Sequence, residues 1–250
     1  HLFGVVGKDE AGARLKRLLR EEGVICTGVR TAQSYQTTEK QRIVISGSHA
    51  LRLDREVHQV PSAALRVMER DICAALQHAD VLVFVDYRKG ALTQASVRRI
   101  VRHAQMRGIP VLADMKPEHA HFFSVLPLVT RNKAEAFAMA GAVTVRGAGR
   151  ALSRTLRSSV LLTESADGMT LFHDSEDVHV PALAQHVVDV SGAGDTVTAA
   201  AALVLARGGS PTEAMYIANA AAAGVVSLPG TARITASSVR RILQTAPYVS

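Results

Sequence analysis

The sequence lacks any run of about 18 apolar residues, so it predicts no membrane-spanning helix. It also lacks a secretory segment at its start. Its only two cysteines, Cys26 and Cys73, lie far apart and without the spacing of metal ligands. They therefore predict buried thiols in a reducing compartment, which favours a cytoplasmic location.

Zinc-binding and nucleic-acid-binding patterns are missing as well. The ten histidines form no HExxH or other zinc motif, and His119 and His121, which form an HxH pair, are expected to be loop or surface residues. The net charge of +7 comes from lysines and arginines interleaved with acidic residues, with no basic run that contains aromatics. This distribution predicts a solvated surface that favours anionic substrates, and it argues against nucleic-acid binding.

The chain is long enough to bury a sizeable core as one principal domain, and no internal repeat or low-complexity linker divides it. From residue 81 onward, short apolar strands alternate with helices. Strands are expected at residues 81–85, 110–113, 128–130, 160–163, 169–172 and 178–180, and helices at 93–107, 133–139, 148–157, 196–207, 212–226 and 236–244. Such alternation predicts an α/β fold with a mostly parallel central sheet that is covered on both faces.

The N-terminal part differs in character. A strand is expected at residues 2–6, a helix at 9–22 and a second helix at 61–78. Between the two helices, residues 27–55 are a β-rich insertion, within which residues 38–46 and 50–54 are typical of a hairpin. We expect this insertion to be a lid, since ligands of open α/β sheets bind at the carboxyl ends of the strands.

The chemistry is expected to centre on residues 189–209, which read DVSGAGDTVTAAAALVLARGG. The valines at 187–188 are predicted to end a buried strand, and residues 192–194 to form a turn that leads into an apolar helix. Free N–H groups at a helix start bind anions. Asp195 beside them suits a base that takes a proton from a hydroxyl group. The alternative is that Asp195 is a helix N-cap and the glycines only a tight turn.

Polar residues follow the apolar strands at several points of the sequence. They are Asp86, Asp114, Asn132 with Glu135, Thr163 and Asp189. A single polar residue after a strand is weak evidence. Together with the GAGD turn, these residues predict a cleft at the carboxyl edge of the sheet.

The segment DVSGAGDT resembles the DTxGAGD motif of the ribokinase (PfkB) family of sugar kinases. Other segments resemble its heptose 7-phosphate kinase branch, which forms the kinase part of ADP-heptose synthases. They are LFGVVGKDEAG, TTEKQRIVISGSHALRLDRE, DYRKGALT, RNKAE and ANAAAAGVVSLPGTA, which follow the family's order over nearly the whole chain. The resemblance implies a ribokinase-like three-layer α/β sandwich with a small β lid, and an ATP-dependent carbohydrate kinase.

The resemblance also implies the catalytic and nucleotide-binding residues. Asp195 matches the catalytic base of the family, and Gly192, Ala193 and Gly194 match its anion hole. The residues implied to bind ATP are Asn132, Lys133, Ala134, Glu135, Thr163 and Asn219. To transfer a phosphoryl group, such residues mainly have to position the reactants and neutralise the charge of the phosphates.

Metal binding is implied for Glu135 and Asp189. Glu135 completes the NxxE motif that organises Mg²⁺, partly through water, and Asp189 matches a region that holds a monovalent cation in several members of the family. The residues alone leave alternatives open. Asn132 and Glu135 can be a helix N-cap and its capping-box partner, and Asn219 can be an ordinary polar helix residue.

The acceptor is implied to be a heptose 7-phosphate whose anomeric hydroxyl is phosphorylated to the 1,7-bisphosphate. Candidate acceptor-binding residues come mostly from the TTxKxR and LRxDRE patterns; they are Lys40, Arg42, Arg52, Asp54 and Lys89. A sugar phosphate needs cationic partners, and this region offers them. The alternative is a charged outer face of the lid. Because β lids of this family often pair between subunits, a homodimer is expected.

The sequence also departs from the family. The strand and the Gly-Gly-x-x-Asn region with which members begin are not among these residues, so we expect the chain to be N-terminally truncated. Arg88, Glu164 and the dipeptide at 228–229 replace the usual residues near the expected cleft. These residues contain no HxGH nucleotidyltransferase motif, so we expect them to be the kinase portion only. These departures leave two alternatives, a kinase for another sugar and a degenerate kinase fold that binds a nucleotide or a partner without catalysis.

Overall fold

The structure is a computed structural model that describes residues 1–45, 48–173, 176–184 and 186–246. The chain divides into two compact units. Unit 1 comprises His1–His78 and Tyr87–His103, and unit 2 comprises Ala79–Asp86 and Ala104–Ser250. Within the described residues, no helix has both the length and the hydropathy needed to cross a bilayer.

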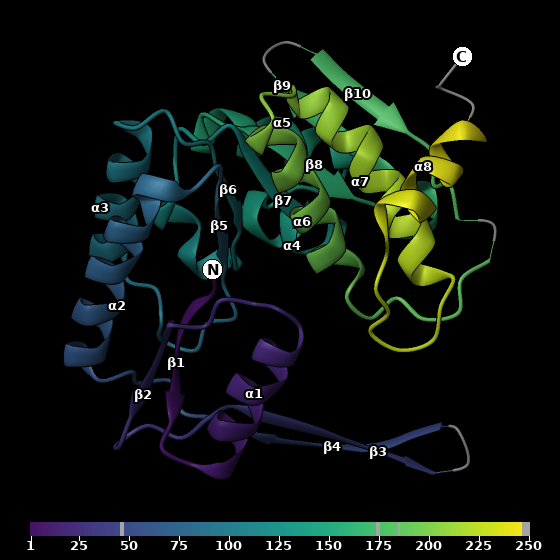
Figure 1. Ribbon diagram of the computed structural model, residues 1–250. Coiled ribbons are helices and arrows are strands. Elements are labelled where there is room, and N and C mark those ends of the chain that lie inside the picture. The colour runs from purple at the N-terminus through teal and green to yellow at the C-terminus, as the bar shows by residue number, and fades with distance from the viewer. Residues whose placement is uncertain (46–47, 174–175, 185, 247–250) are drawn as a thin grey trace. The chain divides into compact units, whose positions relative to one another are not determined.

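Unit 1 is built from two small sheets and their helices (Figure 1). In chain order it contains β1 (Phe3–Gly7), α1 (Glu10–Glu21), β2 (Gly28–Ala32), β3 (Glu39–Ile45), β4 (Ser48–Arg55), α2 (Ser62–Ala75), η1 (Leu76–His78) and most of α3 (Gln94–Gln105). β1 pairs with β2 in parallel, and β3 and β4 form an antiparallel hairpin. The predicted insertion at residues 27–55 is therefore shared between two sheets, because β2 pairs with β1 and not with the hairpin.

Asp9 fixes the start of α1. Its Oδ1 accepts a hydrogen bond from the N–H of Gly12 at 2.8 Å, so Asp9 is the N-cap of the helix. The same carboxylate accepts bonds from the N–H and the hydroxyl of Thr37, at 2.8 and 2.6 Å. Thr37 Oγ1 in turn accepts a bond from the N–H of Gly7. The end of β1, the start of α1 and the segment before the hairpin are joined in this way.

Unit 2 contains a six-stranded sheet in the order β10-β9-β8-β7-β6-β5. The strands are β5 (Leu82–Val85), β6 (Val111–Asp114), β7 (Leu128–Asn132), β8 (Ser159–Thr163), β9 (Met169–His173) and β10 (Glu176–Val180). β5 to β8 are parallel to one another, whereas β9 and β10 are each antiparallel to their neighbours. The prediction of a mostly parallel sheet is confirmed.

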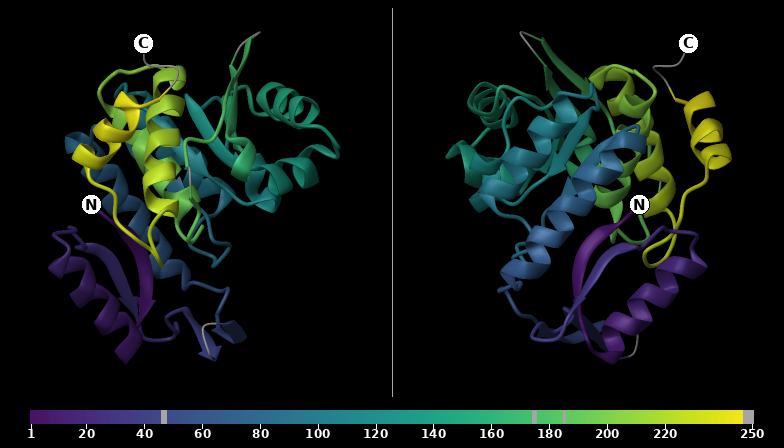
Figure 2. Two further views of the ribbon diagram at one scale, coloured as in Figure 1. Left: turned by 90° about the vertical axis from the view of Figure 1, so that its right-hand side faces the viewer. Right: turned by 60° about the vertical axis from the view of Figure 1, so that its left-hand side comes forward.

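The helical elements of unit 2 lie on both faces of this sheet. They are η2 (Pro117–Phe122), α4 (Lys133–Ala140), α5 (Val145–Leu156), η3 (Ser165–Asp167), α6 (Ala193–Ala206), α7 (Pro211–Val226) and α8 (Ala236–Gln244). α6 and α7 pack against one face, and α4 and α5 against the other. The left view of Figure 2 shows the strands between these two helical layers.

The core between the sheet and helices α6 and α7 is aliphatic. Four neighbouring strands each contribute a leucine with no exposed surface, namely Leu112, Leu128, Leu161 and Leu171. Such continuous burial is typical of strands that are covered on both faces. On the helix side the core is completed mainly by small residues such as Ala201, so the helices lie close to the strands.

The C-terminal helices agree with the sequence. α7 begins with a reciprocal capping box between Ser210 and Glu213, as predicted, and α8 spans the predicted residues 236–244. α6 begins three residues earlier than the predicted start at residue 196. The glycine-rich turn is therefore the first part of the helix.

The prediction of a buried strand that ends at Val187 and Val188 is wrong. Both residues lie in a loop and each exposes 60% of its surface. The backbone N–H groups of Val188 and Asp189 both donate to the carbonyl of Val226, at 2.8 and 3.2 Å. This segment is held by the end of α7 rather than by the sheet, and its apolar sequence alone does not distinguish the two cases.

Candidate active site

The carboxyl ends of four parallel strands bring polar residues to one edge of the sheet in unit 2. Asp86 follows β5, and Asp114, Asn132 and Thr163 are the last residues of β6, β7 and β8. The register pairs Val85 with Asp114 and aligns Asn132 with Thr163. The predicted convergence of these four residues is confirmed. Asp189 does not follow a strand.

The GAGD turn forms the start of α6. Gly192 is the N-cap, with a positive φ of 80° that glycine adopts without strain. Asp195 lies in the first turn of the helix and is exposed. A Cβ placed on Gly194 would meet no atom within 4 Å, so the space beside this turn is open. The N–H of Ala193 donates to the carbonyl of Val190 at 3.2 Å.

The bond from Ala193 reduces the number of amides that could hold an anion. In the described part of the chain, the N–H groups of Gly192 and Gly194 donate to no acceptor. The predicted anion hole of three amides therefore has one member, Ala193, engaged inside the turn. Two remain for a ligand at the positive end of the helix dipole.

Asp189 organises the turn before α6. Its Oδ1 accepts a hydrogen bond from the N–H of Ser191 at 2.8 Å, and its Oδ2 accepts one from the N–H of Gly230 at 3.1 Å. The side chain thereby joins the turn to the loop that follows α7. Both carboxylate oxygens already accept backbone bonds, and the cation-binding role of Asp189 stays a prediction.

Asn132 is the N-cap of α4, because its Oδ1 accepts a bond from the N–H of Glu135 at 2.8 Å. The capping alternative is thus confirmed for Asn132. The reciprocal bond of a capping box is replaced by two cations on the Glu135 carboxylate. Lys116 Nζ lies 2.6 Å from Glu135 Oε1, and Arg131 Nη1 lies 3.0 Å from Oε2.

Arg131 is the centre of this ion-pair network, and the sequence analysis missed it. Its side chain has no exposed surface. One nitrogen of the guanidinium is hydrogen-bonded to Asp114, another to Glu135, and Nε donates to the carbonyl of Thr130 at 2.6 Å. An arginine at the end of a strand gives no sequence signal of burial, because its partner Asp114 is distant in sequence.

The network shifts the pKa values of its two carboxyl groups in opposite directions. Burial raises the pKa of Asp114, and the negative charges of Glu135 and Asp195 add to this effect, although Arg131 opposes it. Burial alone would also raise the pKa of Glu135, but the hydrogen bond from Lys116 and the charge of Arg131 outweigh it and lower the pKa below its ordinary value. Asp195 is therefore close enough to Asp114 for the two charges to interact.

His119 belongs to the same edge; it is a partly exposed residue of η2, and its contact with Asp86 was not expected from the sequence. Its Nδ1 lies 2.7 Å from Oδ2 of Asp86, whose side chain is 3% exposed. The same oxygen accepts a bond from the N–H of Lys116 at 3.3 Å. The imidazole also stacks on Phe122, with 4.4 Å between ring centroids. His121 is exposed, as expected.

Three further residues of unit 2 have structural partners. Thr163 Oγ1 donates to the carbonyl of Arg131 at 3.4 Å. The buried amide of Asn219 donates to the carbonyl of Pro181 at 2.8 Å, which ties α7 to the segment after β10. Glu164 is also buried, and its carboxylate accepts a bond from Thr170. The nucleotide-binding roles of Thr163 and Asn219, and those of Lys133 and Ala134, stay predictions.

The predicted acceptor-binding residues lie in unit 1. Lys40 and Lys89 meet at one carboxylate: both ammonium groups contact Glu56, Lys40 at 3.6 Å and Lys89 through a hydrogen bond. The hydrogen bond from Lys89 lowers the pKa of Glu56. On β4, Arg52 pairs with Asp54 at 3.0 Å.

Arg42 pairs with Arg52 through the backbone of the hairpin. The prediction for its side chain lies outside the described residues.

The side chains at the strand ends offer few direct ligands for Mg²⁺. No group of three or more His, Cys, Asp or Glu side chains among the described residues is arranged to hold a metal ion. Glu135 offers one carboxylate whose oxygens already bind two cations. This arrangement fits an ion held mainly by water and nucleotide phosphates, with Glu135 acting through water.

Comparison with known proteins identifies relatives of the whole chain. The model of the pfkB family carbohydrate kinases matches residues 1–237. The bifunctional protein HldE of Gluconobacter oxydans is 38% identical over 99% of this chain and 53% of that protein. The D-beta-D-heptose 7-phosphate kinase of Bordetella bronchiseptica is 38% identical over 95% of this chain and 76% of that protein. The chain thus spans about half the length of the HldE protein it matches.

Solved structures share the fold at low identity. The ribokinase of Arabidopsis thaliana, complexed with ribose and ATP, aligns with a TM-score of 0.77 at 20% identity, over 98% of this chain and 81% of that one. Phosphofructokinase-2 of Escherichia coli, in complex with potassium, aligns with a TM-score of 0.76 at 18% identity, over 95% and 79%. The predicted ribokinase-like fold is confirmed.

Proposed function

Because the chain belongs to the pfkB family of carbohydrate kinases, we propose that it uses ATP to phosphorylate the anomeric hydroxyl of a heptose 7-phosphate, giving the 1,7-bisphosphate. Its similarity to a heptose 7-phosphate kinase and to HldE supports this acceptor. One observation carries the proposal. Asp195 is exposed in the first turn of α6, beside the open N–H of Gly194 and within electrostatic reach of Asp114.

Asp195 acts as the general base. Its carboxylate accepts the proton of the anomeric hydroxyl as the sugar oxygen forms a bond to the γ-phosphorus of ATP. The bond between that phosphorus and the β,γ-bridging oxygen breaks, and ADP leaves with the electron pair. The amides of Gly192 and Gly194 donate to the oxygens of the transferring group, so the charge that develops there is stabilised without reorganisation.

Glu135 would hold the Mg²⁺ of the nucleotide through water, and the bound ion would supply positive charge that neutralises the phosphates. The protein keeps Glu135 ionised for this task, since Lys116 and Arg131 lower its pKa. Asn132 holds the first turn of α4, and with it the Glu135 backbone, in a fixed position. Lys133, Ala134, Thr163 and Asn219 complete the nucleotide site, and Asp189 is the candidate for a monovalent cation.

Lys40 and Lys89 bind the phosphate of the sugar. The support for this role is that both ammonium groups already converge on one anionic partner, Glu56. A phosphate dianion offers more acceptor oxygens than a carboxylate, so it can take over these contacts. Arg42, Arg52 and Asp54 on the hairpin are the further candidates, and the hairpin is the proposed lid.

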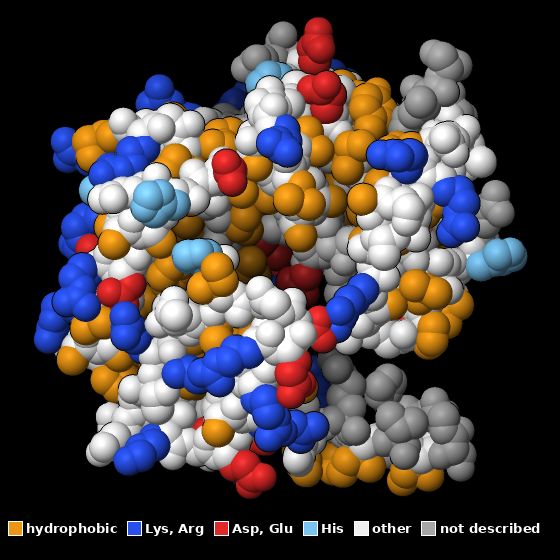
Figure 3. Space-filling model, viewed as in Figure 1, with side chains coloured by type: hydrophobic (Ala, Val, Ile, Leu, Met, Phe, Trp, Pro, Cys, Tyr) orange, Lys and Arg blue, Asp and Glu red, His pale blue; other side chains and the backbone are white. Residues whose placement is uncertain are grey.

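The hairpin is also the proposed dimer contact. Ile43, Ile45, Leu51 and Leu53 lie at alternate positions of the two strands and expose 41 to 63% of their surface. Ile43 is paired with Leu51, so these apolar side chains share one face of a two-stranded sheet. Orange side chains mark this face along the lower edge of the hairpin in Figure 3. An isolated two-stranded sheet is marginally stable, and a second copy would cover this face.

A coupled assay of ADP release tests the proposed activity. The purified chain is given ATP, Mg²⁺ and, one at a time, heptose 7-phosphate, heptose, ribose and fructose 6-phosphate. We expect ADP release that depends on heptose 7-phosphate. Release with another sugar alone would reassign the acceptor, and no acceptor-dependent release would favour a non-catalytic kinase fold. Sedimentation of the protein and of Leu51→Lys tests the dimer, which should dissociate in the variant. The cytoplasmic location stays a prediction.

A further inference from the structure

Lys116 is a second cation at the carboxyl edge of the sheet in unit 2, and it has no assigned contact with substrate. The residue lies two positions after Asp114, which ends β6. Its backbone N–H donates to Oδ2 of Asp86 at 3.3 Å, and its Nζ lies 2.6 Å from Oε1 of Glu135. Both ends of the lysine are therefore fixed, the backbone at the end of β5 and the ammonium group at the first turn of α4.

Arg131, the first cation at this edge, is enclosed by the protein. Its guanidinium bonds to Asp114 and Glu135, and its side chain has no exposed surface, so it cannot contact a ligand. Lys116 differs, because its side chain is 36% exposed. In the part of the chain that the structure describes, its ammonium group bonds only to Glu135. An ammonium group has three donors, so two remain for a ligand.

The start of α6 lies at the same strand ends. Asp114 is paired with Thr130 in the register of β6 and β7. The hydroxyl oxygen of Thr130 lies 2.9 Å from that of Thr198, and both side chains are buried. Thr198 comes three residues after Asp195, which is about one helical turn. The charges of Lys116 and Asp195 both reach the carboxyl group of Asp114. The ammonium group and the GAGD turn therefore act on one region.

We propose that Lys116 is a further catalytic residue, whose ammonium group donates hydrogen bonds to the γ-phosphate of ATP while Glu135 holds it in place. This inference rests on the proposed function, because it needs ATP at this edge. The ammonium group stays protonated and transfers no proton. It neutralises part of the charge on the transferring group, together with the amides of Gly192 and Gly194. Since ADP lacks the γ-phosphate, Lys116 favours ATP over ADP.

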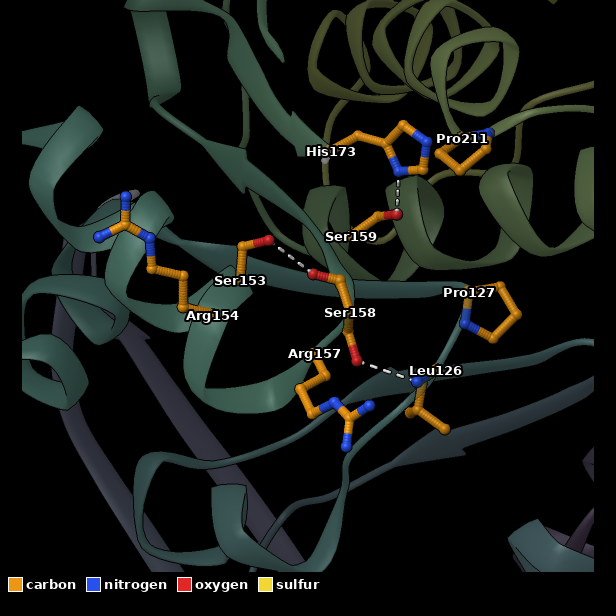
Figure 4. A pocket seen from close by; sticks show the side chains of 9 residues that line it. All are labelled: Leu126, Pro127, Ser153, Arg154, Arg157, Ser158, Ser159, His173 and Pro211. Atoms are coloured by element: carbon orange, nitrogen blue, oxygen red, sulfur yellow. Dashed lines mark hydrogen bonds between the residues drawn. The ribbon is translucent and has the colours of Figure 1, made fainter. Parts of the chain in front are cut away.

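The opposite edge of the same sheet offers a contrast (Figure 4). A cavity opens there, at the amino ends of β7 and β8. Its polar groups bond to one another: Ser158 Oγ accepts from the N–H of Leu126 at 2.9 Å, and Ser159 Oγ lies 2.7 Å from Nδ1 of His173. The guanidinium of Arg154 is directed away from this cavity (Figure 4). Because β7 is five residues long, the two edges are roughly 13 Å apart at about 3.3 Å per residue. Arg154 is thus a cation of the same unit outside the proposed phosphate site.

Equilibrium binding of nucleotides to Lys116→Met tests the contact. Wild type and variant are titrated in a calorimeter with ADP and with AMP-PNP, an ATP analogue that is not hydrolysed, in the presence of Mg²⁺ and without sugar. We expect the dissociation constant of AMP-PNP to rise by roughly tenfold or more and that of ADP to change little, since only AMP-PNP carries the third phosphate group. An equal loss for both nucleotides would reduce Lys116 to a support of Glu135, and no loss for either would also overturn the assignment. Failure of the wild type to bind any nucleotide would instead contradict the proposed function itself.

Two further variants separate charge at this position from charge elsewhere. Lys116→Arg keeps a cation with several donors, so we expect it to retain more affinity for AMP-PNP than Lys116→Met. Arg154→Met removes a cation from an exposed position at the opposite edge and should leave both dissociation constants unchanged. A loss for AMP-PNP as large in R154M as in K116M would contradict the assignment. Thermal unfolding verifies that the three variants fold.

Discussion

The guanidinium of Arg131 is hydrogen-bonded to the carboxylate of Glu135 at 3.0 Å, and the arginine side chain is completely buried. The same guanidinium also holds Asp114. A single buried cation thus fixes two carboxylates, Asp114 at the carboxyl end of β6 and Glu135 in the first turn of α4. This relationship makes Arg131 a structural requirement of the site, although it has no assigned contact with substrate.

Replacing Arg131 with methionine should destabilise the protein strongly. Methionine fills part of the volume but leaves the partly exposed carboxylate of Asp114 without its buried cation. Breaking a fully buried ion pair typically costs roughly 3–5 kcal/mol, so we expect a loss near the lower end of that range. Urea unfolding measures the change. Lys133→Met is the control, because its ion pair with Asp167 is exposed and 3.4 Å long, and exposed pairs contribute little. Equal stability of R131M and wild type would mean that the network does not support the fold.

Because of Glu135, the free energy of unfolding should fall when the pH is lowered into the acidic range. Its pKa is lowered in the folded protein from the ordinary value of 4.5, so it contributes stability that is present above pH 4.5 and is lost as the pH falls through the folded pKa. The difference in unfolding free energy between wild type and Glu135→Gln should therefore shrink on acidification. Denaturant unfolding between neutral pH and pH 3 measures it.

The pKa of Asp114 is shifted in the opposite direction from that of Glu135, so its effect on stability should have the opposite pH dependence. Its raised pKa means that the folded state favours the protonated carboxyl, and the resulting stability is lost as the pH rises through the folded pKa. Asp114→Asn should gain stability relative to wild type as the pH rises through that range. If the unfolding free energies of Glu135→Gln and Asp114→Asn, each relative to wild type, changed with pH in the same direction, the opposite pKa shifts would be contradicted.

Gly194→Leu should impair catalysis without unfolding the helix. A Cβ at this position meets nothing within 4 Å, so the fold accommodates it, but a large side chain would fill the space in which the phosphoryl group approaches the amide. Losing an anion-hole donor costs roughly 10²–10³-fold in kcat. The ADP-release assay and thermal unfolding are measured together.

Ala199→Leu is the matched control for this substitution. Ala199 is an exposed residue of the same helix, about one and a half turns further along, so the change places the same leucine side chain away from the turn. We expect kcat of A199L to equal that of wild type. If G194L also had a normal kcat, the anion hole would have to be removed from the mechanism.

Much of this architecture is encoded locally. The capping box of Ser210 and Glu213, the strands that end at Asp114 and Asn132, and the helix after the GAGD turn each follow from neighbouring residues. The family motif then directs attention to Asp195, which periodicity alone leaves as a possible N-cap.

The parts that the sequence does not predict depend on partners that are distant in the chain. Arg131 and His119 look like surface residues until the sheet places Asp114 and Asp86 against them. Val187 and Val188 look like a strand, but the backbone N–H of Val188 donates to the carbonyl of Val226 at the end of α7 and not to a neighbouring strand. Burial of a charge and choice of a backbone partner are decided by the tertiary fold.

Lys89→Met should weaken the binding of heptose 7-phosphate without weakening the binding of ATP. Its ammonium group contacts Glu56 together with Lys40, and the proposal assigns this pair to the acceptor's phosphate. We expect KM for heptose 7-phosphate to rise by roughly tenfold or more, with KM for ATP unchanged. Lys8→Met, at an exposed position, is the control. A rise confined to KM for ATP would place Lys89 with the nucleotide instead.

The central claim is that Asp195 takes the proton of the acceptor hydroxyl, and Asp195→Asn tests it most directly. The variant keeps the size and exposure of the side chain and removes its basicity. In the ADP-release assay with heptose 7-phosphate, we predict a fall in kcat of roughly 10²–10⁴-fold, with unchanged ATP binding and thermal unfolding. Turnover close to that of wild type would contradict the account.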